Sequence, residues 1–263
     1  MTIKKQHRKR WKILREALRC RTSISHAELS LLVKKHTNVA VDYAVWKFKR
    51  EGVLVGSRRG LYLIAEQAER NTFVKSPIEA IHSLLGKDIV FGYGTALFVH
   101  GLSRYGRLTE YYVLSTRDIK PKRIGDVLVR FIENPLRDEV GIVRHKFGRS
   151  IIRVSDLERT LIDCIHRPKY TQGWENVMHA LGRAKRFNAH RLIEYVKKYG
   201  VPLLAARVGV ILEHFEQRWK ARAQDIDSLL PYIPRRPVKF QRGIKGKLNK
   251  KWNIYLPADL LDE

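Results

Sequence analysis

The sequence predicts an α+β protein, and three observations lead to this class. Residues 25–64 have the pattern of two helices followed by a short hairpin. Apolar runs typical of strands recur between residues 111 and 154, and helical patterns follow from residue 156 onward. Strands followed by a set of helices are characteristic of α+β domains. We therefore expect a small N-terminal domain and a larger domain that combines a small mixed sheet with a helical set.

The N-terminal pattern is the most specific of the three. Ser25 and Glu28 have the spacing of a capping box, which marks a helix start. A second helix is expected from Val39 to Glu51, and Gly52 occupies the position where a left-handed residue ends a helix. Residues 53–55 and 61–64 are expected to form two strands. This order is that of a winged helix-turn-helix, an element that normally reads duplex DNA.

The second helix carries an unusual outward face. At the angular spacing of a helix, its apolar side consists of Val41, Ala44, Val45 and Phe48. The opposite side carries Tyr43, Trp46, Lys47 and Arg50. The cations suit base edges or phosphates, and the rings suit sugars or thymine methyl groups, so we predict that these four residues bind DNA. The alternative is that Trp46 packs on a neighbouring domain and the cations are ordinary solvated charges.

The turn between the two expected strands contains two further candidates. Arg58 and Arg59 lie at its tip, just before Gly60. A basic wing of this kind suits the minor groove or a phosphate, so both are predicted DNA contacts.

The net charge indicates a polyanionic partner. The 263 residues include 52 Lys and Arg against 26 Asp and Glu, a formal charge of +26. Residues 1–64 contribute 16 basic and 4 acidic side chains, and residues 235–251 contribute 8 basic and none acidic. Because the charge is densest beside the expected helix-turn-helix and near the C-terminus, nucleic acid is favoured over other partners.

The expected domains follow these boundaries. Residues 1–65 form the winged helix-turn-helix domain, 76–234 the α+β domain, and 235–263 a basic C-terminal tail in which residues 252–256 could add a strand. Residues 65–75 are a polar connector, and residues 76–79 (SPIE) form a second capping box that starts the larger domain. The expected strands are 88–93, 111–115, 127–133, 141–147 and 151–154, and the expected helices are 76–86, 95–100, 156–166, 173–184, 189–199, 202–215 and 217–230.

Motifs for catalysis, metals and cofactors are not found. The sequence has no phosphate-binding loop, dinucleotide fingerprint, zinc-protease motif or nucleophile elbow. Asp156, Glu158 and Asp163 lie close together, but a capping box of Ser155 with Glu158 and a favourable helix dipole explain the first two better than metal binding. We expect no enzyme activity, no cofactor and no metal.

Three further residues have ordinary explanations. His100 is expected to pack or cap rather than to bind a ligand. Cys20 and Cys164 lack the spacing of a metal site or of a disulfide framework.

No apolar run approaches the length of a membrane span, so we expect a cytoplasmic protein with no membrane partner.

Several segments of the larger domain resemble one known family. They are GTALFVHGLS (94–103), YYVLST (111–116), RVSDLERTLIDCIHRP (153–168), GWENVMHAL (173–181) and ARVGVILEHF (206–215). They are similar to the AbiEi family, the antitoxins and transcriptional regulators of type IV abortive-infection toxin–antitoxin pairs. The resemblance covers about residues 10–220.

The resemblance implies a repressor and antitoxin with two parts. The N-terminal domain would bind duplex DNA at the operon's own promoter. The antitoxin-type α+β domain would counteract a nucleotidyltransferase-like toxin without forming a tight complex with it. The family motif itself indicates architecture: Leu157, Leu161, Ile162 and Ile165 form a buried stripe, and Arg159 and Asp163 are spaced to pair on the exposed side of the helix.

Three other functions stay open at this point. The first is a stand-alone winged-helix transcription factor with no toxin partner, whose second domain would sense a ligand in a polar pocket. The second is a nucleic-acid-processing enzyme, such as a nuclease that uses the three carboxylates. The third is a basic protein associated with RNA or the ribosome. The tail after Leu230 is more basic and longer than a simple two-domain plan requires, and the N-terminal arm is also strongly basic.

Overall fold

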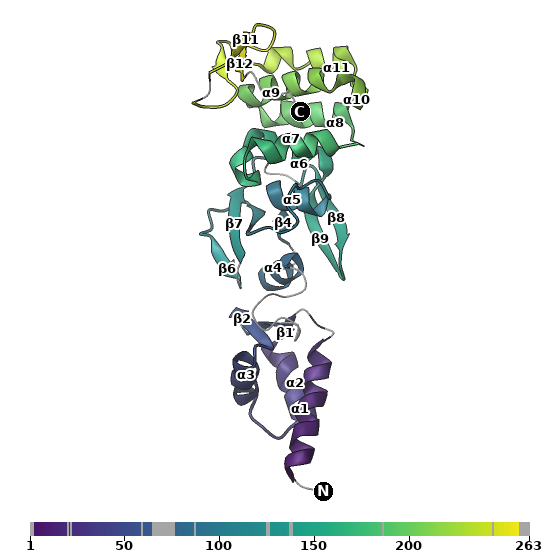
Figure 1. Ribbon diagram of the computed structural model, residues 1–263, viewed down its shortest axis with the longest axis vertical. Coiled ribbons are helices and arrows are strands. Elements are labelled where there is room, and N and C mark those ends of the chain that lie inside the picture. The colour runs from purple at the N-terminus through teal and green to yellow at the C-terminus, as the bar shows by residue number, and fades with distance from the viewer. Residues whose placement is uncertain are drawn as a thin grey trace.

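The computed structural model describes residues 3–19, 21, 23–58, 60–64, 77–86, 88–124, 127–136, 139–185, 187–243 and 245–257. The described chain has a mixed α+β fold with three sheets. Figure 1 shows the N-terminal helices at one end of the long axis, a sheet in the middle, and a helical set with the C-terminal strands at the other end. The expected connector 65–75, Ser76 and Arg59 lie outside the described residues.

The N-terminal unit combines three helices with a three-stranded sheet. Its elements are α1 (Ile3–Arg19), β1 (Ser23–Ser25), α2 (His26–His36), α3 (Val41–Arg50), β2 (Leu54–Arg58) and β3 (Leu61–Ile64). The sheet is antiparallel, in the order β1-β3-β2. Strand β1 was not expected, because three residues carry too little periodicity to predict a strand.

Local capping signals set the ends of these helices. The Ser25 side chain accepts from the Glu28 amide and the Glu28 carboxylate accepts from the Ser25 amide, so the expected capping box is confirmed. Helix α3 ends at Arg50, and Gly52 has a φ of +69°, the left-handed conformation expected after a helix. The buried residues pack into a core separate from the rest of the chain, and they are Trp11, Leu14, Leu18, Ile24, Leu29, Val33, Ala44, Phe48, Val53, Leu54, Tyr62 and Ile64.

A six-stranded mixed sheet forms the middle of the molecule. Its strands are β4 (Val90–Phe91), β5 (Glu110–Ser115), β6 (Lys122–Ile124), β7 (Val127–Glu133), β8 (Ile142–Phe147) and β9 (Ser150–Ser155), in the order β6-β7-β5-β4-β9-β8. Strands β5 and β7 are parallel, as are β4 and β9, and the other neighbours are antiparallel. Two short helices, α4 (Pro77–Leu85) and α5 (Tyr93–Val99), contribute to the apolar core of this sheet.

The helical set follows the sheet. It consists of α6 (Leu157–His166), the 3₁₀ turn η1 (Pro168–Thr171), α7 (Trp174–Arg183), α8 (Ala189–Tyr199), α9 (Pro202–His214), α10 (Glu216–Trp219), α11 (Ala223–Asp227) and the 3₁₀ turn η2 (Leu230–Tyr232). The single helix expected over residues 217–230 is wrong. Lys220 adopts a left-handed φ of 50°, which ends α10, and the Trp219 side chain is held by distant partners, the Ala184 carbonyl at 3.2 Å and the Phe187 ring at 4.5 Å. These tertiary contacts break the segment into short pieces.

The basic C-terminal segment is folded onto this helical set. Residues 235–263 are expected to form a basic tail in which residues 252–256 could add a strand. The described part, 235–257, contains strands β10 (Val238–Lys239), β11 (Lys247–Asn249) and β12 (Ile254–Leu256), and β12 lies within the expected strand. The side chains of Phe240, Trp252 and Ile254 are fully buried in the helical core. Burial of these apolar side chains offsets the cost of fixing a strongly charged segment.

Candidate functional site

The outward face of α3 is the first candidate site. Ala44 and Phe48 are fully buried against the N-terminal core, whereas Tyr43 and Trp46 are 48% and 53% exposed. Arg50 is also exposed. The division of the helix into an apolar and an outward side therefore agrees with the predicted faces. Two large aromatic side chains exposed on one helix are unusual for a surface without a partner.

The exposed side chains of α3 form a stack. The rings of Tyr43 and Trp46 are 5.7 Å apart with an interplanar angle of 29°. The Arg50 guanidinium lies 5.4 Å from the centre of the Trp46 ring. This stack presents one cation and two flat apolar surfaces to the same side of the helix. Such a combination suits a nucleic acid, whose grooves offer phosphates, base edges and thymine methyl groups.

A residue from outside α3 supports the stack. Trp11 of α1 makes edge-on contacts with both Tyr43, at 6.3 Å between ring centres, and Phe48, at 5.3 Å. Trp11 is not among the residues predicted from the sequence, and its helical spacing with Leu14 and Leu18 is the signal that could have indicated a buried position. Trp11 therefore holds the outer face of α3 against the core of the N-terminal unit.

Lys47 has a different environment from Arg50. Its Nζ lies 2.8 Å from the Glu51 carboxylate and 5.2 Å from the centre of the Trp11 ring. Glu51 also accepts from Arg15 at 2.5 Å, and these two cations together lower the pKa of the Glu51 carboxyl against the opposing effect of burial. Lys47 thus joins α3 to α1, and Arg50 is the cation of this face that is stacked on an exposed ring.

The hairpin beside α3 contains the remaining predicted contacts. Arg58 ends strand β2, and Arg59 lies outside the described residues. The Lys49 ammonium lies 5.6 Å from the centre of the Tyr62 ring on β3, so it is a cation between helix and hairpin that the sequence pattern did not single out. Lys49 belongs to neither the apolar nor the aromatic side of α3, so the sequence pattern gives no signal for it.

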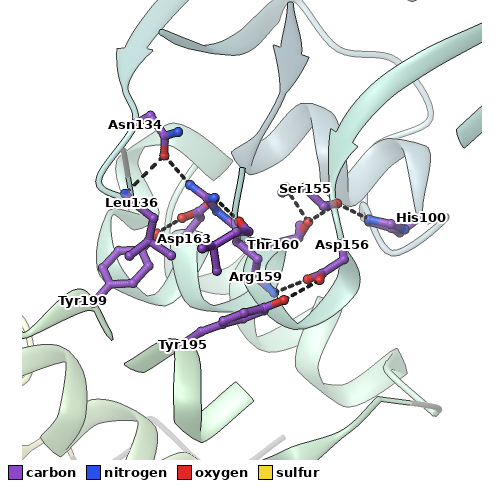
Figure 2. Close-up of polar contacts among 11 residues, drawn as sticks. His100, Asn134, Leu136, Ser155, Asp156, Arg159, Thr160, Asp163, Tyr195 and Tyr199 are labelled. Carbon is purple, nitrogen blue, oxygen red and sulfur yellow. Dashed lines mark hydrogen bonds and ion pairs between the residues drawn. The ribbon is translucent and has the colours of Figure 1, made fainter. Parts of the chain in front are cut away.

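A second candidate is the polar network around the start of α6, shown in Figure 2. The expected capping box of Ser155 and Glu158 is wrong, because Asp156 is the residue that caps the helix, accepting from the Arg159 amide at 2.8 Å. The Ser155 hydroxyl instead bonds to Thr160, and Glu158 accepts from the Asn188 amide at 2.7 Å. Asp156 thus closes the first turn of α6, whereas Glu158 connects the helix to the residue that precedes α8.

The Asp156 carboxylate also joins α6 to α8. Its Oδ2 accepts from the Tyr195 hydroxyl at 2.7 Å and forms an ion pair with Arg191 at 2.8 Å (Figure 2 shows the tyrosine contact). His100 lies beside this cluster and donates from Nε2 to the Ser155 carbonyl at 2.8 Å, because a carbonyl can only accept. The expectation that His100 packs rather than binds a ligand agrees with this contact.

Arg159 and Asp163 form the buried centre of the network. They were expected to pair on the exposed side of the helix, but both side chains are fully buried, with Arg159 Nε 3.7 Å from Asp163 Oδ2. The Arg159 guanidinium also donates to the Val140 carbonyl and to the Asn134 side chain, and the Tyr199 hydroxyl donates to Asp163. The network therefore ties α6 to the segments that follow β7 and precede β8, and to the end of α8.

Gly141 makes room for Arg159. It has a φ of +68°, and a side chain there would place its Cβ 2.9 Å from the Arg159 Cδ. Both the backbone conformation and the contact favour glycine.

The three carboxylates considered for catalysis, Asp156, Glu158 and Asp163, each accept a hydrogen bond from another group of the protein. In these contacts they connect elements of the fold.

Burial of Asp163 leads to a pH prediction. Loss of hydration raises its pKa from 3.8 to about 7, although Arg159 acts in the opposite direction. The folded state then binds more protons than the unfolded state between these values, so this group should reduce the free energy of unfolding as the pH rises from about 4 to about 7. Asp163→Asn, which keeps an acceptor for Tyr199, should remove this slope in urea titrations of the two proteins.

Wild type and Asp163→Asn must be compared, because His166 has the opposite effect on how the free energy of unfolding changes with pH. Burial lowers its pKa from 6.5 to about 4, so it contributes stability that increases as the pH rises through this range. The difference between wild type and Asp163→Asn cancels the histidine contribution. A difference that does not change between pH 4 and pH 7 would contradict the assignment to Asp163.

A cavity of about 290 Å³ opens beside the central sheet. Its polar lining includes Asp88, Asn134, Glu139 and Arg153, with Ile89, Val113 and Phe131 among its apolar residues. The Arg153 guanidinium donates to the Asp88 carbonyl and to the Glu139 carboxylate.

No group of three or more candidate metal ligands occurs among the described residues, and none of the described helices is long and apolar enough to cross a bilayer.

These features define an α+β protein with an exposed aromatic and cationic helix face at one end. No protein-family model matches the chain, and no curated protein matches it. Among solved structures it is similar to the Rv2827c protein of Mycobacterium tuberculosis, with a TM-score of 0.69, 15% sequence identity, and coverage of 95% of this chain and 92% of that chain. At this identity the likeness extends to the fold alone.

Proposed function

We propose that this protein is a DNA-binding transcriptional regulator whose residues 1–65 form a winged helix-turn-helix domain. The observation that carries the proposal is the exposed stack of Tyr43, Trp46 and Arg50 on α3. The order of three helices and a β2–β3 hairpin supports the proposal, because this order is typical of winged helices.

In this proposal α3 enters the major groove, which is about 12 Å wide and admits one helix. Arg50 contacts a guanine edge or a phosphate, and the rings of Trp46 and Tyr43 contact sugars or thymine methyl groups. Arg58 and Arg59 of the hairpin reach the backbone or the minor groove. Residues 1–64 carry 16 basic and 4 acidic side chains, and this positive charge attracts the domain to the phosphates of DNA.

The test is a gel-shift titration with the protein's own promoter region and a scrambled duplex of equal length. We expect tighter binding to the promoter and a steep loss of affinity with salt, since each phosphate contact releases counterions. Equal affinity for both duplexes would contradict a specific repressor.

Substitutions on α3 test the residues. Arg50→Ala should weaken promoter binding by about 1–3 kcal/mol if the guanidinium reads a base edge. Lys47→Ala should weaken it less, because Lys47 is already paired with Glu51. The matched control is Lys35→Ala, which removes an exposed cation from α2. Equal affinities for Arg50→Ala and the control, with unchanged circular dichroism, would mean that α3 does not enter the groove.

We further propose that the larger domain acts as the antitoxin of a nucleotidyltransferase-like toxin. The support is the resemblance of residues 94–103, 111–116 and 153–168 to the AbiEi family. The protein would then work in the cytoplasm, repressing its operon through α3 and counteracting the toxin without a tight complex.

The two activities should separate in the full-length protein. The N-terminal unit has its own apolar core, so a Trp46→Ala/Arg50→Ala variant should keep the larger domain intact. It should lose repression of a promoter reporter and still protect cells that express a nucleotidyltransferase-like toxin encoded beside this protein. Absence of such a neighbouring gene, or loss of protection in this variant, would favour a regulator that has no separate antitoxin domain.

A stand-alone regulator that senses a ligand is the second candidate. The cavity beside the central sheet favours it, because the polar groups of Asp88, Glu139 and Arg153 converge there among apolar residues. A change in promoter affinity on addition of a small polar metabolite, abolished by Arg153→Ala, would support this function over the antitoxin.

A further inference from the structure

The C-terminal strands form a small sheet with one exposed face. Strand β12 is central, and the register places Tyr255 opposite Lys239 of β10 on one side and opposite Leu248 of β11 on the other. Successive residues of a strand point to opposite faces. Ile254 is fully buried and Tyr255 is 38% exposed, so Lys239, Tyr255 and Leu248 lie in a row on the outer face.

This face belongs to the most basic part of the chain. Residues 235–251 contain eight Lys and Arg and no Asp or Glu. Lys251 is neutralised by Glu213 at 2.5 Å and Asp227 at 2.7 Å. The other seven are exposed and form no ion pair within the described part of the chain: Arg235, Arg236, Lys239, Arg242, Lys245, Lys247 and Lys250. A concentration of like charge destabilises the folded state, and a bound polyanion relieves the repulsion.

The cations are held by a rigid support. The Trp252 indole is fully buried and donates to Glu213 at 2.7 Å. Arg207 of α9 donates twice to the Phe240 carbonyl, at 2.9 Å from Nε and 2.5 Å from Nη2, and its guanidinium lies 5.0 Å from the centre of the Trp174 ring. The described part of the basic segment is therefore anchored before binding, which lowers the cost of ordering its backbone.

We propose that this sheet is a second nucleic-acid-binding surface, specific for single strands. Tyr255 stacks on an unpaired base, Lys239 beside it on the same face contacts a phosphate, and the exposed Arg242 and Lys245 of the connection between β10 and β11 contact further phosphates. An aromatic ring on a sheet flanked by cations is the arrangement that binds single-stranded nucleic acids, because stacking requires a free base face that a duplex hides. The surface lies at the opposite end of the molecule from α3 (Figure 1), so it is distinct from the proposed duplex site and does not depend on it.

The test uses the full-length protein and fluorescein-labelled oligouridylate and oligothymidylate of about 20 nucleotides, with fluorescence anisotropy as the readout. Lys239→Ala/Arg242→Ala/Lys245→Ala should lower the affinity for both strands at least about tenfold and reduce its salt dependence. The matched control is Arg183→Ala/Lys185→Ala/Lys198→Ala, which removes three exposed cations from the far ends of α7 and α8 and the loop between them. The control should change the affinity little.

Substitutions of Tyr255 distinguish the contribution of base stacking to the affinity from that of charge. Tyr255→Ala should lower single-strand affinity about tenfold, while Tyr255→Phe should keep the wild-type value because the ring remains. An unchanged affinity in Tyr255→Ala, or an equal loss in the control triple variant, would overturn the proposal. Loss of duplex binding without loss of single-strand binding in the sheet variant would also overturn it, since the surface would then extend the duplex site.

Discussion

Replacing Arg159 with methionine should reduce the free energy of unfolding by about 3–5 kcal/mol, the cost of breaking a buried ion pair. Arg159 and Asp163 are both fully buried, so the substitution leaves the aspartate without its cation in a site that water does not reach. It also removes the donor to Asn134 and Val140. Urea unfolding at neutral pH measures the loss.

A double variant distinguishes the broken pair from a packing defect. Arg159→Met/Asp163→Leu removes both charges and fills the space with apolar groups, which is often nearly neutral for a buried pair. We expect it to recover a large part of the lost stability. A loss below about 1 kcal/mol in the single variant would mean that Arg159 contributes only as much as an ordinary hydrogen bond.

Replacing Gly209 with alanine should destabilise the protein, although alanine favours helices by about 1 kcal/mol over glycine. Gly209 lies within α9, and a Cβ there would come within 2.3 Å of the Trp252 ring. The ring is fully buried and cannot yield without losing its place in the core. The net loss should be about 3 kcal/mol, toward the upper end of the cost of overpacking a core.

Gly182→Ala is the matched control, because it lies in α7 and a Cβ there meets nothing within 4 Å. This substitution should be neutral or stabilising. Trypsin digestion adds a local readout: Gly209→Ala should expose Lys245, Lys247 and Lys250 to faster cleavage, because the segment loses its anchor at Trp252. Equal stability and equal cleavage of the two variants would show that Trp252 does not hold the segment.

The two basic regions differ in how they are attached to the rest of the protein. The cations of α3 lie on a small unit with its own core, whereas those of residues 235–251 are attached to the helical set through Phe240, Trp252 and Ile254. The two basic regions therefore lie at opposite ends of the long axis, where Figure 1 shows α3 and the C-terminal strands. This arrangement is the basis for the two nucleic-acid surfaces that we propose.

The sequence by itself determined the features that depend on neighbours along the chain. The capping box of Ser25 and Glu28, the left-handed Gly52 and the outward face of α3 all appear where local spacing places them. Strand β7 matches the expected residues 127–133, and the α+β class followed from the order of such elements. These predictions succeeded because capping and helical periodicity involve residues within about four positions of each other.

Tertiary structure alone decided which polar residues are buried and where the charged C-terminal segment lies. A pair spaced like Arg159 and Asp163 is compatible with an exposed or a buried helix face, and only the contacts with Asn134, Val140 and Tyr199 resolve the choice. Asp156 caps α6 in place of the expected Ser155, whose hydroxyl is hydrogen-bonded to Thr160 instead. In the same way, the basic segment is part of the core because Trp252 packs on Gly209, a residue far away in the sequence. Burial depends on such distant partners, and local spacing carries no information about them.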